Sequence, residues 1–161
     1  MLFLSLSCKK EDPLPAVTGD GRNVFACYVD GSVWKHYSKD FKANTLSAQY
    51  IQSDKKLKIF ASRSGDTTTE KMLIVIQNFP LQIGTYYLDG GGSYAEFIRI
   101  EPTLRREYHS GSEHTGKVII TKVDQVNRIV TGTFSFTGGE AKGSEQVEIE
   151  DGRFDVIYFI Y

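Results

Sequence analysis

The sequence predicts an all-β domain, an antiparallel β-sandwich or a flattened β-barrel of about ten short strands. Three observations predict this class. From Val24 onward, apolar residues recur with a period of two rather than 3.6. Segments of alternating character are separated by residues typical of turns, glycine above all. No window of a dozen residues carries the pattern of an amphipathic helix, so we expect at most a single helical turn, near 38–43.

The first hairpin is the strongest local signal in the chain. Residues 25–29 alternate in character, and Asp30-Gly31 follows them directly. Both central residues of a type I′ turn need positive φ, which Asp-Gly adopts readily. We therefore expect a tight turn at this dipeptide and a return strand that begins at Val33.

The same alternation sets out the remaining strands. A second hairpin is predicted with strands at 46–50 and 57–61 around a turn at 53–55. Residues 72–76 are continuously apolar, as expected of a strand covered on both faces. The polar stretch 104–116 is the longest predicted loop. The other predicted strands lie at 84–88, 94–100, 118–123, 129–136, 147–149 and 154–160, with turns at 89–93, 124–127, 138–143 and 151–152.

The N-terminal residues resemble a bacterial lipoprotein signal. A short apolar run, 2–7, ends at Cys8 and is followed by a charged, proline-containing stretch. The resemblance implies cleavage before Cys8, lipid on this cysteine, and a protein held on the membrane without a spanning helix. We accordingly expect residues 1–8 to be a truncated signal and lipobox, 9–21 a flexible tether, and 22–161 a single β domain. An ordinary apolar N-terminus with a chance cysteine is the alternative.

The residues directly after Cys8 bear on the location of the protein. Lys10-Glu11-Asp12 resembles the export signal that sends some lipoproteins of Gram-negative bacteria to the cell surface. The resemblance implies a lipid anchor in the bacterial outer membrane and exposure on its outer face.

Composition excludes other classes of function. The 161 residues suffice for one domain with a sizeable core. The 19 basic and 20 acidic residues nearly cancel, so no overall field favours nucleic acid. The chain has two cysteines. With Cys8 lipidated, Cys27 has no partner for a disulfide, and we expect it to be a small buried hydrophobe. We expect a monomer that takes no cofactor.

Several blocks, in their order along the chain, carry a resemblance to a family. They are Phe25 to Trp34, Gly84 to Tyr86, Gly116 to Asp124, Gly132 to Phe136 and Asp151 to Val156. Together they are similar to the recurring blocks of a domain-of-unknown-function family of Gram-negative bacterial lipoproteins. The resemblance implies an all-β domain on a lipid anchor, and it brings no activity, ligand or catalytic residue.

Residues that could carry catalysis are few. His109, Glu113 and His114 could ligate zinc, but they lie on no predicted helix and no cysteine cluster completes the set. The sequence contains no Gly-x-Ser-x-Gly elbow. Glu148 and Glu150 share a strand face about 7 Å apart, as in some glycosidases, but an outward polar face predicts the same pair. We therefore expect no enzyme, no catalytic residue and no metal site. A metal-assisted hydrolase that uses the His109/Glu113/His114 loop is the alternative.

Tyrosines beside glycine-rich loops are the one functional hint. Tyr87 and the tyrosine before it point to opposite faces, so one of them leaves the core, and Tyr94 follows three glycines. Exposed tyrosines offer rigid contact area and a hydroxyl to sugars or peptides. We expect a non-enzymatic binding or structural module that contacts an extracellular glycan or protein. Its predicted contacts are Tyr87, Tyr94, Arg105 and His109, with the loop at 104–115 as the main candidate. Tyrosine as an ordinary strand former at a sheet edge is the alternative.

Overall fold

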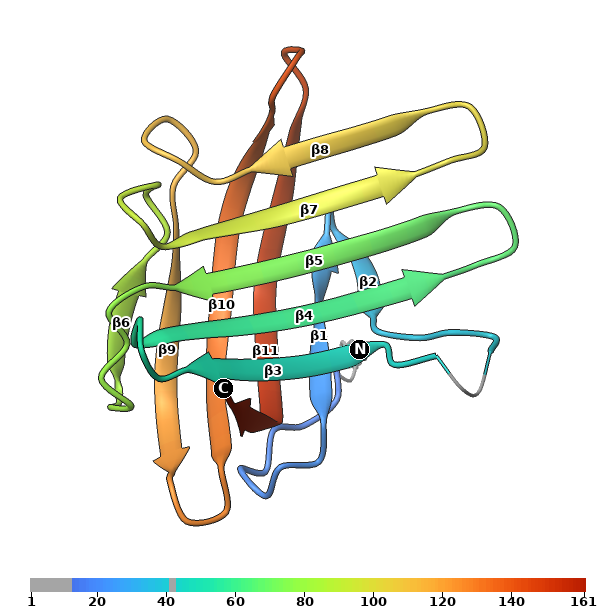
Figure 1. The fold of residues 1–161 in the computed structure, drawn as a ribbon. Helices are drawn as coiled ribbons and strands as arrows, with labels where there is room; N and C mark the ends of the chain where they lie inside the picture. The colour runs from blue at the N-terminus through green and yellow to red at the C-terminus, as the bar shows by residue number, and fades with distance from the viewer. Residues whose placement is uncertain (1–12, 41–42) are drawn as a thin grey trace, which may run out of the picture.

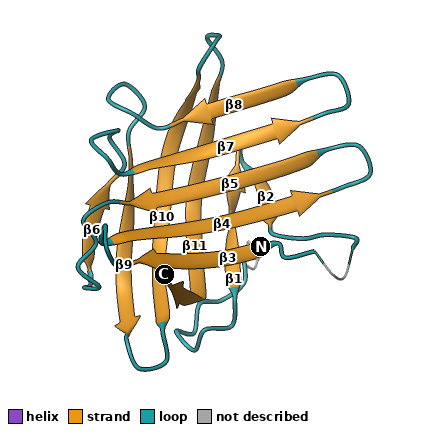
Figure 2. Ribbon diagram, viewed as in Figure 1, coloured by secondary structure: helices purple, strands orange, loops and turns teal. Residues whose placement is uncertain are grey.

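The structure, a computed structural model, describes residues 13–40 and 43–161. Cys8 and the rest of the predicted signal lie outside the described residues. Every regular element in the described part is a β-strand (Figure 2), so the helical turn considered near 38–43 does not form in its described residues. No helix there is long and apolar enough to cross a membrane. The strands are β1 (Val24–Val29), β2 (Ser32–Lys35), β3 (Leu46–Ile51), β4 (Lys56–Ser64), β5 (Thr69–Ile76), β6 (Gly84–Tyr87), β7 (Tyr94–Ile100), β8 (Arg105–His109), β9 (Gly116–Asp124), β10 (Ile129–Glu140) and β11 (Gln146–Ile160).

The strands form two layers that cross each other (Figure 1). One layer has the order β2-β1-β11-β10-β9-β6, and the other has the order β3-β4-β5-β7-β8. Two long strands join the layers. The end of β11 pairs in parallel with β3 from Tyr158↔Ala48 onward, and the end of β10 pairs with β8 through Gly139↔His109. The result is a flattened sandwich built from one continuous mixed sheet, which confirms the predicted all-β class.

The core fills the space between the layers. Alternate residues of each strand point inward, as the period of two predicts. Phe25, Trp34 and Phe134 meet at the centre, with the ring of Phe25 6.0 Å from that of Trp34 and 4.8 Å from that of Phe134. Each fully buried side chain of this size stabilises the fold by about 1.5–3 kcal/mol. Cys27 lies in this cluster. Burial, and to a smaller extent the negative charge of Glu70, raises the pKa of its thiol to about 12, so the thiol stays protonated.

The first predicted hairpin is confirmed. β1 and β2 pair antiparallel, and Val29 opposes Ser32 across the turn. Asp30 and Gly31 have φ of 48° and 74°, the positive values that a type I′ turn requires.

The turn predicted at 151–152 is wrong, because β11 passes through it without reversing. Asp151 takes a φ of 48°, and the register with β10 shifts between Phe134 and Phe136, which marks a β-bulge. Gly152 lies under the ring of Phe134, where an added Cβ would come within 2.5 Å of a ring carbon. The glycine is therefore needed for close packing within a strand and does not form a hairpin turn.

The long loop predicted at 104–116 is also wrong in part. Its first half forms β8, which pairs with β7 through Phe97↔Tyr108. Tyr108 is the one apolar inward residue of this charged strand, so the alternation was too weak to predict it. The turn predicted at 138–143 begins later than expected, because Gly138 continues β10. It packs closely on Tyr108, since a Cβ added to Gly138 would come within 2.9 Å of the Cβ of Tyr108.

The described part of the predicted tether, 13–21, packs on the domain. The buried carboxylate of Asp155 on β11 accepts hydrogen bonds from the backbone N–H groups of Gly19 and Gly21, at 3.0 and 2.9 Å. Leu14 is also buried. The segment 13–21 is therefore held against the outer face of the first layer rather than hanging free.

Candidate functional site

The four predicted contact residues are distributed over both layers. Tyr87 lies on β6 at the edge of the first layer, with 66% of its surface exposed. Tyr94 begins β7 in the second layer and is half-buried. Burial, and to a smaller extent the negative charge of the nearby Glu96, raises the pKa of the Tyr94 hydroxyl. Arg105 and His109 lie at opposite ends of β8. Tyr87 lines a hollow to which none of the other three contributes.

Arg105 and His109 contact carboxylates of their own layer. Arg105 Nε donates to Glu107 Oε1 at 2.5 Å, and this contact lowers the pKa of Glu107. His109 Nδ1 lies 3.4 Å from Glu96 Oε1, and its Nε2 lies 3.8 Å from Glu107 Oε2. These side chains form a charged network on the outer face of β7 and β8.

The loop of the alternative hydrolase hypothesis presents no ligand set. The ring of His114 lies against the backbone of Gly139, and the neighbouring Glu113 is exposed. Within residues 13–40 and 43–161, no three His, Cys, Asp or Glu side chains are grouped as metal ligands would be.

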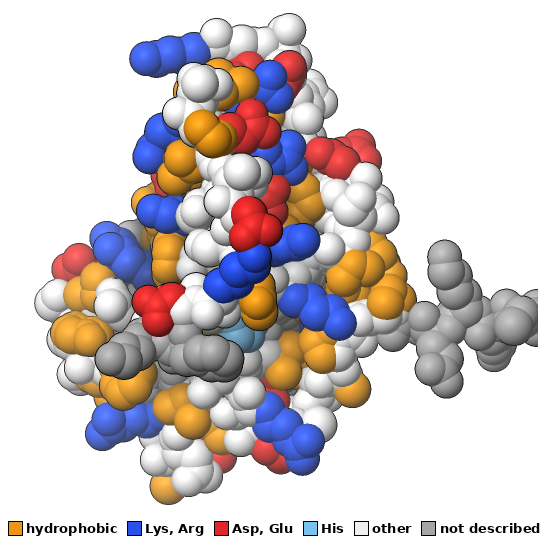
Figure 3. All heavy atoms as spheres, turned by 90° about the vertical axis from the view of Figure 1, so that its right-hand side faces the viewer, with side chains coloured by type: hydrophobic (Ala, Val, Ile, Leu, Met, Phe, Trp, Pro, Cys, Tyr) orange, Lys and Arg blue, Asp and Glu red, His pale blue; other side chains and the backbone are white. Residues whose placement is uncertain are grey.

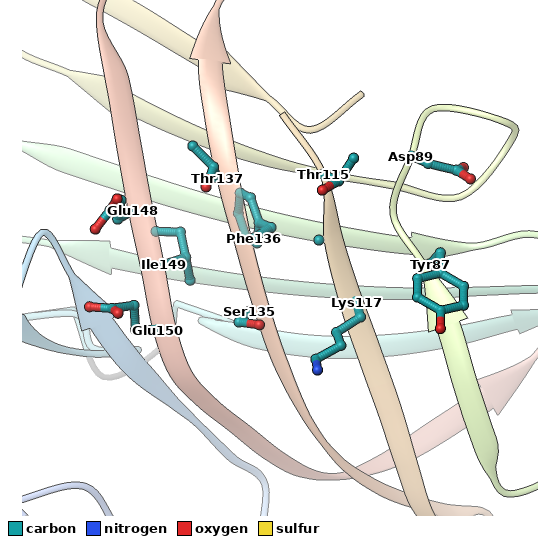
Figure 4. Close-up of a pocket in the computed structure, with 11 residues that line it drawn as sticks. Tyr87, Asp89, Thr115, Lys117, Ser135, Phe136, Thr137, Glu148, Ile149 and Glu150 are labelled. Atoms are coloured by element: carbon teal, nitrogen blue, oxygen red, sulfur yellow. The ribbon is translucent and has the colours of Figure 1, made fainter. Parts of the chain in front are cut away.

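A hollow with a volume of about 580 Å³ lies on the outer face of the first layer. We call it the outer-face hollow (Figure 4). Its lining includes one exposed aromatic ring, hydroxyls, one ammonium and three carboxylates. These side chains are Tyr87, Asp89, Thr115, Lys117, Ser135, Thr137, Glu148 and Glu150.

The strand register places these side chains side by side. Tyr87 on β6 opposes Lys117 on β9, and Lys117 opposes Ser135 on β10. In the next row, Thr137 on β10 opposes Glu148 on β11. Residues two apart on one strand share a face, so each strand adds a second polar group to the same surface. Figure 4 shows Lys117 and Ser135 between Tyr87 at one side and Glu150 at the other.

The charges of the outer-face hollow do not balance. Three carboxylates, from Asp89, Glu148 and Glu150, face one lysine, Lys117, which leaves a net charge of −2. Among the described residues that line it, none is a histidine or a cysteine. The arrangement can donate and accept hydrogen bonds over a wide area and offers one aromatic face.

A second hollow adjoins the first. It has a volume of about 410 Å³ and shares Lys117 and Ser135 with the outer-face hollow. Val17 of the N-terminal segment forms part of its wall, together with Thr133 and Arg153. The N-terminal segment and the outer-face hollow therefore lie on the same layer of the molecule.

Sequence patterns predicted only part of this site. Strand alternation indicates that either Tyr87 or the tyrosine before it leaves the core, and that Glu148 and Glu150 share a face. Lys117 and Ser135 were missed, because each is an ordinary outward residue of its strand. Only the pairing of β6, β9 and β10 shows that they lie beside Tyr87.

The fold and the hollow define a class: a crossed-layer β-sandwich domain with a polar, aromatic-edged surface on one layer. A protein-family model described as Domain of unknown function (DUF6252) matches residues 29–157, from the end of β1 to near the end of β11. The chain belongs to this family. The predicted resemblance to a family of unknown function is confirmed, while the lipoprotein character remains a prediction. No curated protein matches the sequence, and no solved structure matches the chain.

Proposed function

We propose that this protein is a non-enzymatic binding module of the bacterial cell surface, held on the outer membrane by lipid on Cys8, and that its outer-face hollow binds an extracellular glycan. The observation that carries the proposal is the cross-strand row of Tyr87, Lys117 and Ser135, which places an exposed ring beside polar groups. A volume of about 580 Å³ falls within the range of about 300–1,000 Å³ typical of small-molecule sites.

A glycan suits this surface better than an apolar ligand. The ring of Tyr87 offers a flat face to a sugar ring, and it is rigid, so little conformational entropy is lost on contact. The hydroxyls of Ser135 and Thr137 and the carboxylates of Glu148 and Glu150 supply hydrogen-bond partners for sugar hydroxyls. Many such partners spread over an open surface are what a polyhydroxylated chain requires.

The charge of the hollow narrows the class of glycan. A net charge of −2 repels acidic polymers, since like charges brought together cost several kcal/mol. Neutral sugars and amino sugars avoid this cost. We therefore assign the hollow to a neutral or amino-sugar polymer.

The proposed anchor is compatible with binding close to the membrane. Nine residues separate Cys8 from Val17. A fully extended chain of that length spans at most about 30 Å. Lipid on Cys8 would hold the domain within that distance of the membrane, where polymers of the cell envelope are concentrated.

The test is binding of the full chain with Cys8→Ser, which cannot be acylated, to an array of neutral, amino and acidic glycans. We expect binding to neutral or amino sugars, and we expect Tyr87→Ala to weaken it about tenfold, or about 1.4 kcal/mol. Tyr161→Ala removes an equally exposed ring from the C-terminus and serves as the matched control. Absence of binding across the array, or equal losses in both variants, would overturn the proposal.

A further inference from the structure

A third hollow lies at one end of the sandwich, where the edge strand β2 of the first layer meets β4 of the second. It has a volume of about 460 Å³ and is lined by Val33, Lys35, His36, Tyr37 and Arg63. We call it the end hollow. Figure 3 looks onto this end of the molecule and shows several Lys and Arg side chains near its middle, with Asp and Glu side chains among them.

Backbone hydrogen bonds hold the aromatic and the guanidinium side by side. Tyr37 N–H donates to Ser62 O at 3.0 Å, and Ser64 N–H donates to Tyr37 O at 2.8 Å. These bonds flank Arg63 and form a parallel bridge between Tyr37 and Arg63. Arg63 Nη1 also donates to Val33 O of β2 at 3.3 Å, so the guanidinium spans the two layers. Tyr37 keeps 54% of its surface exposed, which leaves its ring available to a ligand.

The described lining of the end hollow is positive. Lys35 and Arg63 contribute a charge of +2, and none of the described residues that line it carries a carboxylate. Burial, opposed by the hydrogen bond to Asn23, lowers the pKa of His36. His36 is therefore neutral near pH 7, and its ring nitrogens lie 2.9 Å from Thr45 Oγ1 and 3.1 Å from Asn23 O.

The carboxylate nearest to Arg63 in the strand register is already engaged. Arg63 and Glu70 oppose each other across β4 and β5. However, Glu70 Oε1 accepts from Arg99 Nε at 2.9 Å, and Glu70 Oε2 accepts from Trp34 Nε1 at 2.8 Å. Each carboxylate oxygen thus has its own donor on another strand, and the charge of Glu70 is balanced by Arg99. Arg63 donates to a backbone carbonyl and lines both the end hollow and an adjoining hollow that contains Glu70, Arg99 and Glu101.

We propose that the end hollow binds the anionic group of an acidic saccharide. The planar guanidinium of Arg63 fits a carboxylate or sulfate through two parallel hydrogen bonds, and Lys35 adds a second positive charge. The exposed ring of Tyr37 packs against the sugar ring that carries the anion. This site is distinct from the outer-face hollow, which has the opposite charge, and it does not depend on the function proposed there.

The test is isothermal titration of the Cys8→Ser chain with three probes: an oligogalacturonate, a sulfated heparin oligosaccharide and neutral maltohexaose. We expect at least one anionic probe to bind and the neutral probe not to bind at this site. A preference for the oligogalacturonate assigns a carboxylate ligand, and a preference for the heparin oligosaccharide assigns a sulfate ligand. Failure of both anionic probes to bind would overturn the proposal.

Variants locate the site. Arg63→Gln and Tyr37→Ala should each weaken the anionic probe about tenfold. Lys142→Gln, which removes an exposed cation elsewhere, should leave the affinity unchanged. Tyr87→Ala in the outer-face hollow should also leave it unchanged, which separates this proposal from the previous one. Thermal unfolding of each variant shows whether it folds, and Tyr37→Ala tests the site even if Arg63→Gln does not fold. Equal losses in Lys142→Gln and the site variants would contradict the assignment.

Discussion

The buried carboxylate of Asp155 accepts a hydrogen bond from the backbone N–H of Gly21 at 2.9 Å, although 134 residues separate them in the chain. The same carboxylate accepts from the N–H groups of Gly19 and Asp20 and from the hydroxyl of Thr131. Gly19 and Gly21 have φ of 76° and 72°, which lets their N–H groups converge on one anion. This contact joins the start of the domain to its last strand and determines where the N-terminal chain leaves it.

The first prediction concerns the strength of this contact. Asp155→Asn replaces a charged acceptor by an amide that must turn one N–H₂ group toward several donors. We expect a loss of about 2–4 kcal/mol in the free energy of unfolding, because hydrogen bonds to charged groups contribute about 1.5–3 kcal/mol each and are not additive. Urea denaturation measures it. Asp20→Asn changes an exposed carboxylate in the same segment and should cost under about 0.5 kcal/mol, so equal losses would refute the assigned role.

The second prediction concerns pH. Burial alone would raise the pKa of Asp155, but the donors from Gly21, Thr131 and the neighbouring backbone outweigh it and lower the pKa. A carboxyl with a lowered folded-state pKa stabilises the fold above its unfolded pKa of about 3.9 and loses this contribution as pH falls through the folded value. The stability difference between wild type and Asp155→Asn should be constant from about pH 6 to 8 and should shrink below about pH 4. If the stability difference between the two proteins stays constant below about pH 4, the pKa of Asp155 is not lowered in the folded state.

The third prediction compares two glycines with nearly the same backbone conformation. Gly21 and Gly31 have φ of 72° and 74°. A Cβ on Gly31 meets nothing within 4 Å, whereas a Cβ on Gly21 comes within 2.9 Å of Ile157 and 3.0 Å of Ile129. Gly31→Ala should therefore cost only the backbone strain, about 1–2 kcal/mol. Gly21→Ala should cost about 1–3 kcal/mol more, since crowding adds to the strain. Equal costs in chemical denaturation would mean that the N-terminal segment does not pack as described.

The fourth prediction concerns the bulge in β11. Gly152→Ala places a methyl group against the ring of Phe134 and should destabilise the fold by about 1–3 kcal/mol through overpacking. Gly111→Ala is the control, because nothing lies within 4 Å of its added Cβ. In a double-mutant cycle with Phe134→Leu, the cost of Gly152→Ala should fall, since the smaller side chain removes the clash. Purely additive costs would count against this packing.

The two Asp-Gly dipeptides show what sequence could and could not predict about the fold. At Asp30-Gly31 the turn depends on local conformation alone, and the prediction was right. At Asp151-Gly152 the same signal was wrong, because the ring of Phe134, which lies on another strand, requires a glycine there. The contacts of residues 13–21 could not be predicted from sequence for a similar reason. The partner of Gly21 is Asp155 at the other end of the chain, and no local pattern indicates such a contact.

The same limit applies to the candidate sites. An exposed Tyr87 could be predicted from alternation along one strand. Its neighbours Lys117 and Ser135 could not, because they become neighbours only through the register of three strands. The pairing of Tyr37 with Arg63 likewise depends on an isolated bridge between a loop and β4.

The central claim, that the outer-face hollow binds a neutral or amino-sugar glycan, is tested most directly by mapping the bound ligand on the protein. The measurement is a titration of isotope-labelled Cys8→Ser chain with the best-binding glycan, followed by amide chemical shifts. We expect the largest changes in amide chemical shift at Tyr87, Lys117 and Ser135. In Tyr87→Ala, we expect the changes at Lys117 and Ser135 to disappear. Changes confined to Arg105 and His109 on β8, with none in the outer-face hollow, would contradict the account.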